Sequence, residues 1–230
     1  MYILIAVAME CEATPLIEKL ENDSIKVIHG YTFHIGKINN KNVIIGISNI
    51  GIINMSSMIS IAIMKFDINI ILNYGLSGGY GNIHKGQIIV GKECININSY
   101  ITKKDKKINI NNINLASFYN KNNEISIYKA DNNLLNIIKS IDNNIIYGRI
   151  GSGDVWNKEE EKINFLYNNY NVLCEDMESI AVYQVSNKFN IPSISIRIIS
   201  NNEILNEEYD DTIINDLVKS IIKFINTLSI

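Results

Sequence analysis

The chain has 230 residues, of which 47% are hydrophobic, so it is long and apolar enough to bury a large core. Its 21 basic and 24 acidic residues give a formal net charge of −3, and no basic stripe appears, which argues against nucleic acid as a partner. The apolar stretch at residues 1–8 is too short for a signal peptide or a membrane span and predicts a buried strand, so we expect no membrane partner.

The cysteines give no sign of a disulfide framework or a metal site. Cys11, Cys94 and Cys174 are far apart and form neither a CxxC pair nor a zinc spacing. Their odd number and wide spacing suit a reducing cytoplasm, where we expect the protein to act. The chain also lacks the GxxxxGK[ST] phosphate loop and a GxGxxG dinucleotide fingerprint. No metal and no cofactor is therefore expected.

Strand and helix patterns alternate along the chain. Apolar and β-branched runs predict strands at residues 2–8, 25–28, 31–36, 43–48, 68–73, 87–90, 145–150, 172–174 and 193–199. Apolar residues at helical spacing predict helices at 13–20, 52–66, 132–141, 158–170, 177–189 and 212–228. This alternation predicts an α/β fold, a single domain over residues 1–230, with a largely parallel sheet and helices on both faces.

Two features make the boundaries harder to place. The polar stretch 96–123 shows no clear period, and we expect a long excursion with a short strand, serving as a flap or an interface loop. Asparagine is abundant throughout, so we treat it as a poor marker of turns here.

Four of the predicted strand ends present acids, amides or glycines. They are Glu12, the glycine-rich loop 74–81, the stretch 151–154 and the pair Ser200–Asn201, and Glu178 lies at the start of a predicted helix. In open α/β sheets, ligands bind at the carboxyl ends of the strands. We therefore expect these groups to line one cleft.

Each motif alone also has a structural explanation. Glu12 and Glu178 suit the first turn of a helix, where the helix dipole favours an acid. Ser152 and Asp154 suit caps of the helix that follows them. Trp156, the only tryptophan, fits a core position, and stacking against a flat base is the alternative.

Taken together, the motifs resemble those of the purine nucleoside phosphorylase and nucleosidase superfamily, and within it the 5′-methylthioadenosine/S-adenosylhomocysteine nucleosidases. Residues 8–12 (AMECE) are similar to the family's AMEEE, 73–79 (NYGLSGG) to NTGSAGG, 152–154 to SGD, 176–178 (DME) to EME, and 196–201 (IRIISN) to VRAISD. The five motifs occur in the family's order and cover nearly the whole chain.

The resemblance implies a twisted, mixed sheet flanked by helices, a homodimer, and hydrolysis of the N-glycosidic bond between adenine and a 5′-thio-substituted ribose. It makes Glu12 the base that activates water, Met177 and Glu178 the ribose-binding residues, and Trp156 and Asn157 the frame of the purine. The further substrate-binding positions that it implies are Met9, Ile50, Ser77, Gly78, Asp176 and Ser200.

The chain departs from the family at Asn201, where the family has a catalytic Asp. An amide can donate a hydrogen bond to N7 of the leaving purine but cannot give up a proton. Either N7 is only hydrogen-bonded, or Glu203 supplies the acid, or the base is a 6-oxopurine rather than adenine.

The chain lacks the basic phosphate-binding motifs of the phosphorylases, which favours water as the nucleophile. A hydrolase or phosphorylase for another purine nucleoside and a catalytically weak nucleoside-binding protein remain as alternatives.

Overall fold

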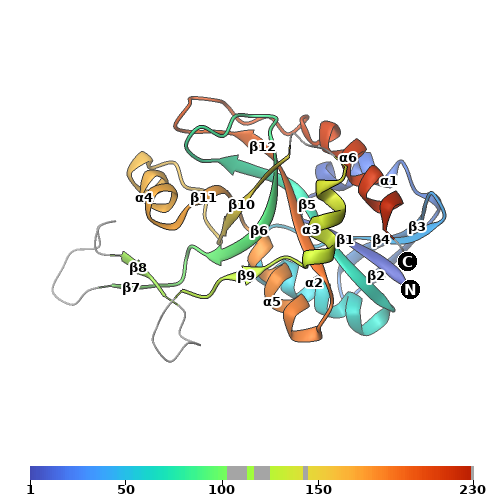
Figure 1. Cartoon of the computed structure of the whole chain (residues 1–230). Coiled ribbons are helices and arrows are strands. Elements are labelled where there is room, and N and C mark those ends of the chain that lie inside the picture. Colours follow the sequence, from blue (N-terminus) through green and yellow to red (C-terminus); the bar gives the residue numbers. More distant parts are fainter. Residues whose placement is uncertain (103–112, 117–124, 142–144, 229–230) are drawn as a thin grey trace.

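The computed structural model describes residues 1–102, 113–116, 125–141 and 145–228 (Figure 1). Within these ranges the helices are α1 (Glu10–Ile17), α2 (Ile52–Lys65), α3 (Asn132–Lys139), α4 (Glu160–Tyr170), α5 (Ser179–Phe189) and α6 (Ile214–Thr227). None of them is both long and apolar enough to cross a membrane.

Ten of the described strands form a large mixed sheet, and their order across it is β11-β10-β6-β12-β5-β1-β4-β3-β2, with β9 paired to β6. Their bounds are β1 (Tyr2–Val7), β2 (Glu21–Ile28), β3 (Tyr31–Ile38), β4 (Lys41–Ile47), β5 (Ile68–Gly79), β6 (Ile88–Asn96), β9 (Tyr128–Lys129), β10 (Ile146–Ser152), β11 (Val172–Asp176) and β12 (Ser193–Asn201). β1, β4, β5 and β12 run parallel where they pair with one another, and antiparallel pairs join β2, β3 and β4.

The core lies on both faces of this sheet, as the apolar runs predicted. Along β1, Ile3, Ile5 and Val7 pack into one cluster, and Leu4 and Ala6 pack into the other. Successive side chains of a strand point to opposite faces, so a strand covered on both sides has to be apolar throughout. Helices α1, α3 and α6 contribute to the first cluster and α2 to the second, while α5 contributes to both, with Ile180 and Tyr183 in the first and Ala181 and Val182 in the second. Figure 1 shows these helices around the sheet.

The prediction of a loop at 74–81 is wrong for most of these residues. They belong to a strand, because β5 continues to Gly79. Its last residues pair with both β12 and β11, which supply the hydrogen bonds that a loop would lack. Gly75 is required by a close approach: a Cβ there would lie 2.5 Å from Arg197 Nη1 and 2.6 Å from Glu12 Oε1.

Asparagine occupies most of the left-handed backbone positions, although many other asparagines lie inside helices and strands. All but one of the non-glycine residues with positive φ in the described ranges are asparagines, and His29 is the exception. Asn171 and Asn190 end α4 and α5 in the left-handed conformation, with φ of 54° at both. Asparagine tolerates this region better than most residues, and the chain uses it where other proteins use glycine.

Most of the expected excursion at 96–123 lies outside the described residues. Two short strands, β7 (Tyr100–Thr102) and β8 (Ile113–Leu115), pair in an antiparallel sheet of their own. The short strand expected in this stretch is therefore present as a pair of strands.

Candidate active site

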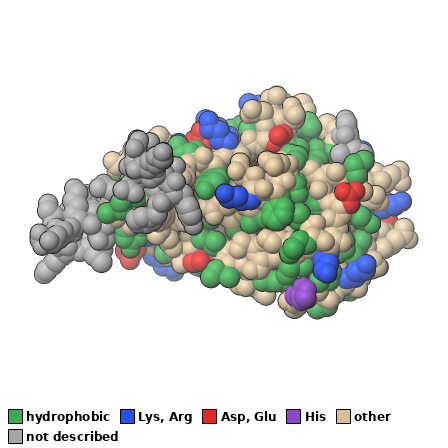
Figure 2. Space-filling model, turned by 90° about the horizontal axis from the view of Figure 1, so that it is seen from below, with side chains coloured by type: hydrophobic (Ala, Val, Ile, Leu, Met, Phe, Trp, Pro, Cys, Tyr) green, Lys and Arg blue, Asp and Glu red, His purple; other side chains and the backbone are tan. Residues whose placement is uncertain are grey.

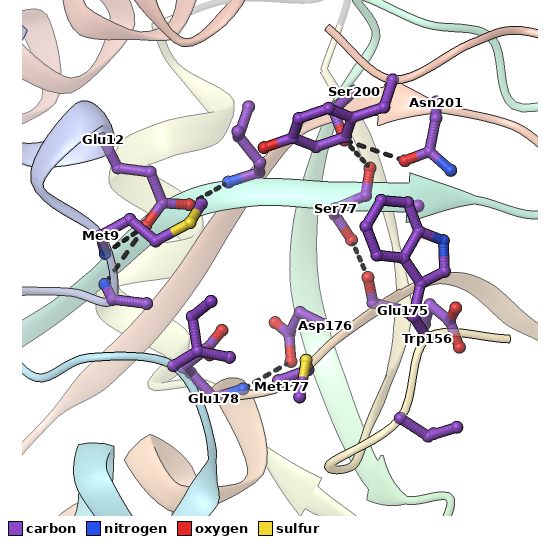
Figure 3. A pocket seen from close by; sticks show the side chains of 16 residues that line it. Met9, Glu12, Ser77, Trp156, Glu175, Asp176, Met177, Glu178, Ser200 and Asn201 are labelled. Atoms are coloured by element: carbon purple, nitrogen blue, oxygen red, sulfur yellow. Dashed lines mark hydrogen bonds between the residues drawn. The ribbon is translucent and has the colours of Figure 1, made fainter. Parts of the chain in front are cut away.

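A pocket opens at the carboxyl ends of β1, β5, β11 and β12, where sequence motifs predicted a cleft (Figure 3). The tertiary structure brings the chain's separate motifs to its wall. Of the expected site residues, these line it: Met9, Glu12, Ile50, Ser77, Gly78, Trp156, Asp176, Met177, Glu178, Ser200 and Asn201. Asn157 does not line it and is instead buried behind Glu175, which does.

Glu12 is a buried carboxylate held by backbone N–H groups. It is 2% exposed and lies in the first turn of α1, which follows β1 directly. Its Oε2 accepts hydrogen bonds from Met9 N (3.0 Å) and Ala8 N (3.2 Å), and its Oε1 accepts one from Leu76 N (2.8 Å). Burial raises the pKa of Glu12, opposed by Arg197 and by these donors.

Glu12 therefore does have the structural role expected of an acid in the first turn of a helix. Its side chain accepts from the backbone N–H of the N-cap residue Met9, as in a capping box. It does not exclude a chemical role, because Glu12 also lines the pocket wall. A carboxylate with a raised pKa, fixed by three donors, is a suitable proton acceptor for a bound water.

Glu178 lies across the pocket from Glu12 and is 5% exposed. Its Oε1 accepts a hydrogen bond from Gly51 N at 3.0 Å, and Arg197 Nη2 lies 3.7 Å from its Oε2. Burial raises the pKa of Glu178 to about 7, against the attraction of Arg197. The helix was predicted to begin at residue 177, but it begins at Ser179 with Glu178 as its N-cap residue.

Asp176 has mainly structural partners. Its Oδ1 accepts from Ser179 N at 3.0 Å and Glu178 N at 3.2 Å, which caps α5. Its Oδ2 lies 2.8 Å from Arg197 Nε. Asp176 thus orients the start of α5 and, with it, the neighbouring Glu178.

Arg197 is the charge centre behind the pocket, and no sequence motif marked it as such. It is 1% exposed on β12 and pairs with both Asp176 and Glu178. Burial alone would lower its pKa, but Asp176, Glu178 and Glu12 raise it. The sequence does contain a signal for this role. Arg197 is the single charged residue in the β-branched run 193–199, and a charge buried in a strand needs partners of opposite charge.

The opposite end of the pocket is formed by amides, hydroxyls and rings. Ser200 Oγ lies 3.0 Å from Asn201 Oδ1 and 3.2 Å from the backbone oxygen of Ser77, so its single proton has two acceptors within reach. Asn201 Nδ2 lies 3.4 Å from Glu203 Oε1, so the acid considered as a substitute is close to it. Glu203 itself does not line the pocket.

The core position expected for Trp156 is wrong, because its side chain is 50% exposed. Its ring centroid lies 5.5 Å from that of Tyr209, and its Nε1 donates to Glu203 Oε1 at 3.3 Å. Tyr209 also lines the pocket. It follows the last motif in a polar segment, and no sequence pattern marked it.

Ser152 and Asp154 are caps, but not of the helix that follows them. Asp154 Oδ1 accepts from Ile52 N at 2.8 Å, at the first residue of α2. Ser152 Oγ accepts from Ile180 N at 3.1 Å, at the start of α5. The following helix, α4, has no side-chain cap. Ser152 and Asp154 therefore hold the starts of α5 and α2, which are distant in the sequence, next to the end of β10.

A model of the phosphorylase superfamily matches residues 2–228 of the chain. A 5′-methylthioadenosine/S-adenosylhomocysteine nucleosidase of Geobacillus sp. (strain WCH70) is 27% identical over 213 residues, covering 87% of this chain and 85% of the relative. One from Maridesulfovibrio salexigens is 29% identical over 208 residues, with the same coverage. The chain spans most of each relative.

Solved structures show the same fold. The Neisseria meningitidis nucleosidase in complex with methylthio-immucillin-A superposes with a TM-score of 0.82 at 20% identity, covering 99% of both chains. The futalosine hydrolase of Helicobacter pylori superposes with a TM-score of 0.81 at 22% identity, covering 99% of this chain and 96% of that one.

Proposed function

This chain belongs to the phosphorylase superfamily, and from that premise we propose that it is an N-glycosidase that hydrolyses 5′-methylthioadenosine and S-adenosylhomocysteine. The products are adenine and the corresponding 5-thioribose compound. The observation that carries the proposal is the pair of buried carboxylates, Glu12 and Glu178, on the walls of one pocket whose far end carries Trp156 and Asn201.

The lining of the pocket favours water over phosphate as the nucleophile. Among the described residues that line it, none is a lysine or an arginine. Arg197 lies behind the wall and is paired with Asp176 and Glu178. A phosphate ion would therefore meet carboxylates without a cation to balance its charge.

In this mechanism Glu12 takes a proton from water while the water oxygen attacks C1′ of the ribose. The C1′–N9 bond breaks, and its electron pair leaves with the purine. The sugar passes through an oxocarbenium-like state, which the nearby carboxylates stabilise. Glu178 accepts hydrogen bonds from the ribose hydroxyls, and Met9, Met177 and Ile50 provide apolar contacts to the sugar and its 5′-substituent.

At the base end, Trp156 stacks against the purine and Asn201 Nδ2 donates a hydrogen bond to N7. Because an amide keeps its proton, the leaving purine is protonated by a second water, and the hydroxide that this leaves takes up the proton that Glu12 acquired, which restores the carboxylate. Ser77, Gly78 and Ser200 border the base, and Asp176 fixes Glu178 through the cap of α5.

A product assay tests the proposal. The protein is incubated with 5′-methylthioadenosine and S-adenosylhomocysteine, with and without phosphate. We expect free adenine and an unphosphorylated sugar at a rate that phosphate does not change. A sugar 1-phosphate would indicate a phosphorylase, and nucleoside binding without base release would indicate a binding protein.

We also propose that the protein works as a homodimer in cytoplasmic methionine salvage. The family resemblance supports this, as do the exposed Ile53 (76%) and Met64 (68%) on α2. Figure 2 looks onto the side that carries α2 and α5, where hydrophobic side chains gather. Sedimentation should give about twice the chain mass of 26.0 kDa, and Ile53→Glu combined with Met64→Glu should give the monomer.

A further inference from the structure

The proposed mechanism leaves one pocket carboxylate unused. Glu175 ends β11 beside Asp176, lines the pocket next to Trp156, and is 6% exposed (Figure 3). Its Oε1 accepts from Asn157 N at 2.8 Å. Its Oε2 accepts from Tyr80 OH at 2.6 Å and from Asn157 Nδ2. These donors come from different segments, so the carboxylate is held rigidly.

Glu175 still has a hydrogen-bond acceptor site to offer. A carboxylate has about four lone-pair sites, and three donors occupy Glu175. Asn157 is buried behind Glu175 and does not line the pocket, so a ligand reaches the carboxylate and not the amide. Glu175 is therefore complementary to a ligand that brings an N–H group.

Glu175 and Asn201 converge on Gly78. A Cβ at Gly78 would lie 3.6 Å from Glu175 Cγ and 3.8 Å from both Nδ2 and Oδ1 of Asn201. Asn201 therefore brings an amide donor to the part of the pocket wall that Glu175 also lines. The base end of the pocket thus carries an amide and a carboxylate side by side.

We propose that Glu175 is a specificity-determining residue that accepts a hydrogen bond from the exocyclic amino group of adenine, while Asn201 donates to N7 of the same base. This inference rests on the proposed function and deepens it. Along this edge adenine presents an acceptor at N7 and then a donor at its 6-amino group. A 6-oxopurine presents a second acceptor at O6, which the Glu175 carboxylate would repel.

The experiment compares 5′-methylthioadenosine with 5′-methylthioinosine, which differ at position 6 of the base. The parent protein should favour the amino substrate by at least ~10²-fold in kcat/KM, because sites built around a substrate N–H reject analogues that lack it. Glu175→Gln should lower kcat/KM for the amino substrate and narrow this ratio to within about tenfold. Tyr80→Phe removes one of the hydrogen bonds that hold Glu175, so it should narrow the ratio less than Glu175→Gln does.

Glu93→Gln is the matched control. Glu93 pairs with Arg149 on neighbouring strands and does not line the pocket, so its loss should leave the ratio unchanged. Equal losses on both substrates in Glu175→Gln would make Glu175 merely structural and overturn the inference. A parent that prefers the 6-oxo substrate would also overturn it, because Glu175 would then face N1–H.

Two further measurements cover a Glu175→Gln variant that does not fold and separate the assignment of Glu175 from the proposed function. If Glu175→Gln does not fold, calorimetry on the parent with adenine and unsubstituted purine replaces it, and adenine should bind at least about tenfold more tightly. Equal binding would overturn the inference. If adenine binds selectively to the parent and Glu175→Gln loses this selectivity, but no nucleoside is cleaved, the proposed function fails and the assignment of Glu175 stands. If both nucleosides are cleaved equally, the proposed function stands and the assignment of Glu175 fails.

Discussion

At the scale of single residues, the pocket is a set of carboxylates whose environments differ. Glu12 is held by three backbone N–H groups, Glu178 by one N–H group and Arg197, and Glu175 by a tyrosine and an asparagine. Burial raises the pKa of all three carboxylates. Chemically identical groups can thus take separate roles because their partners differ.

The first prediction concerns Glu12→Gln. The amide cannot accept the proton of water, so kcat should fall by roughly 10²–10⁴-fold. Gln keeps one oxygen acceptor, which can serve either the Met9 and Ala8 N–H groups or that of Leu76, and the base end of the pocket is unchanged, so the affinity for free adenine should change little. Steady-state kinetics and calorimetry measure the two effects. Glu10→Gln, on the exposed side of α1, is the control and should behave like the parent. A Glu12→Gln rate within tenfold of the parent would remove Glu12 as the base.

The second prediction concerns Asn201→Asp. A carboxylic acid can share a proton with N7 as the bond breaks, so kcat on 5′-methylthioadenosine should rise, by about tenfold at low pH. The gain should shrink as pH rises and the Asp ionises. Where the Asp is ionised, the amide donor is lost and the carboxylate repels O6, so the rate on 5′-methylthioinosine should fall there. Unchanged rates on every substrate would show that Asn201 does not touch the base.

At the scale of elements, the start of α2 depends on the pocket. Its first N–H groups are received by two distant carboxylates: Ile52 N donates to Asp154, and Gly51 N donates to Glu178. A helix start leaves such donors unpaired unless side chains accept them. The position of α2, and with it Ile50 at the pocket wall, is therefore set by residues more than a hundred positions away in the sequence.

The third prediction tests this cap. Asp154→Ala should lower the free energy of unfolding by about 1 kcal/mol, the usual cost of losing an N-terminal cap. Urea denaturation measures it. Asp154→Asn keeps an oxygen acceptor at the same place and should lose less. If both variants unfold at the parent's urea concentration, Asp154 does not hold α2.

At the scale of the whole molecule, the buried acids make stability depend on pH. The pKa of Glu178 is raised to about 7 in the folded state, so the folded state holds this proton more tightly than the unfolded state. The resulting stabilisation is complete below pH ~4.5, the pKa of the unfolded group, and is lost as pH rises through about 7. The raised pKa values of Glu12 and Glu175 act in the same direction.

The fourth prediction follows from this loss of stability with rising pH. Between pH 5 and pH 8 the parent should lose more stability than Glu178→Gln, by up to about 3 kcal/mol at ~1.4 kcal/mol per pKa unit. Urea denaturation of both proteins at the two pH values gives the comparison. Parallel pH dependences for parent and variant would show that Glu178 is not the group responsible.

The sequence by itself determined the α/β alternation and the location of the pocket. Apolar runs as short as β1 predict strands covered on both faces, and the carboxyl ends of parallel strands meet at one edge of the sheet. Glu12, Glu178 and Asn201 were therefore identifiable as lining residues, because their position follows from local pattern and from the direction of the strands.

Tertiary structure alone decided which partner each polar group has. Asp154 caps α2 rather than the helix after it, β5 continues through its glycines because β11 and β12 pair with them, and Arg197 balances Asp176 and Glu178. Glu175 lies in a motif of several acids, and only its contacts with Tyr80 and Asn157 direct it to the base end of the pocket. Hydrogen bonds and ion pairs act over a few ångströms, so such partners are fixed by how the chain packs, and local sequence pattern carries no record of them.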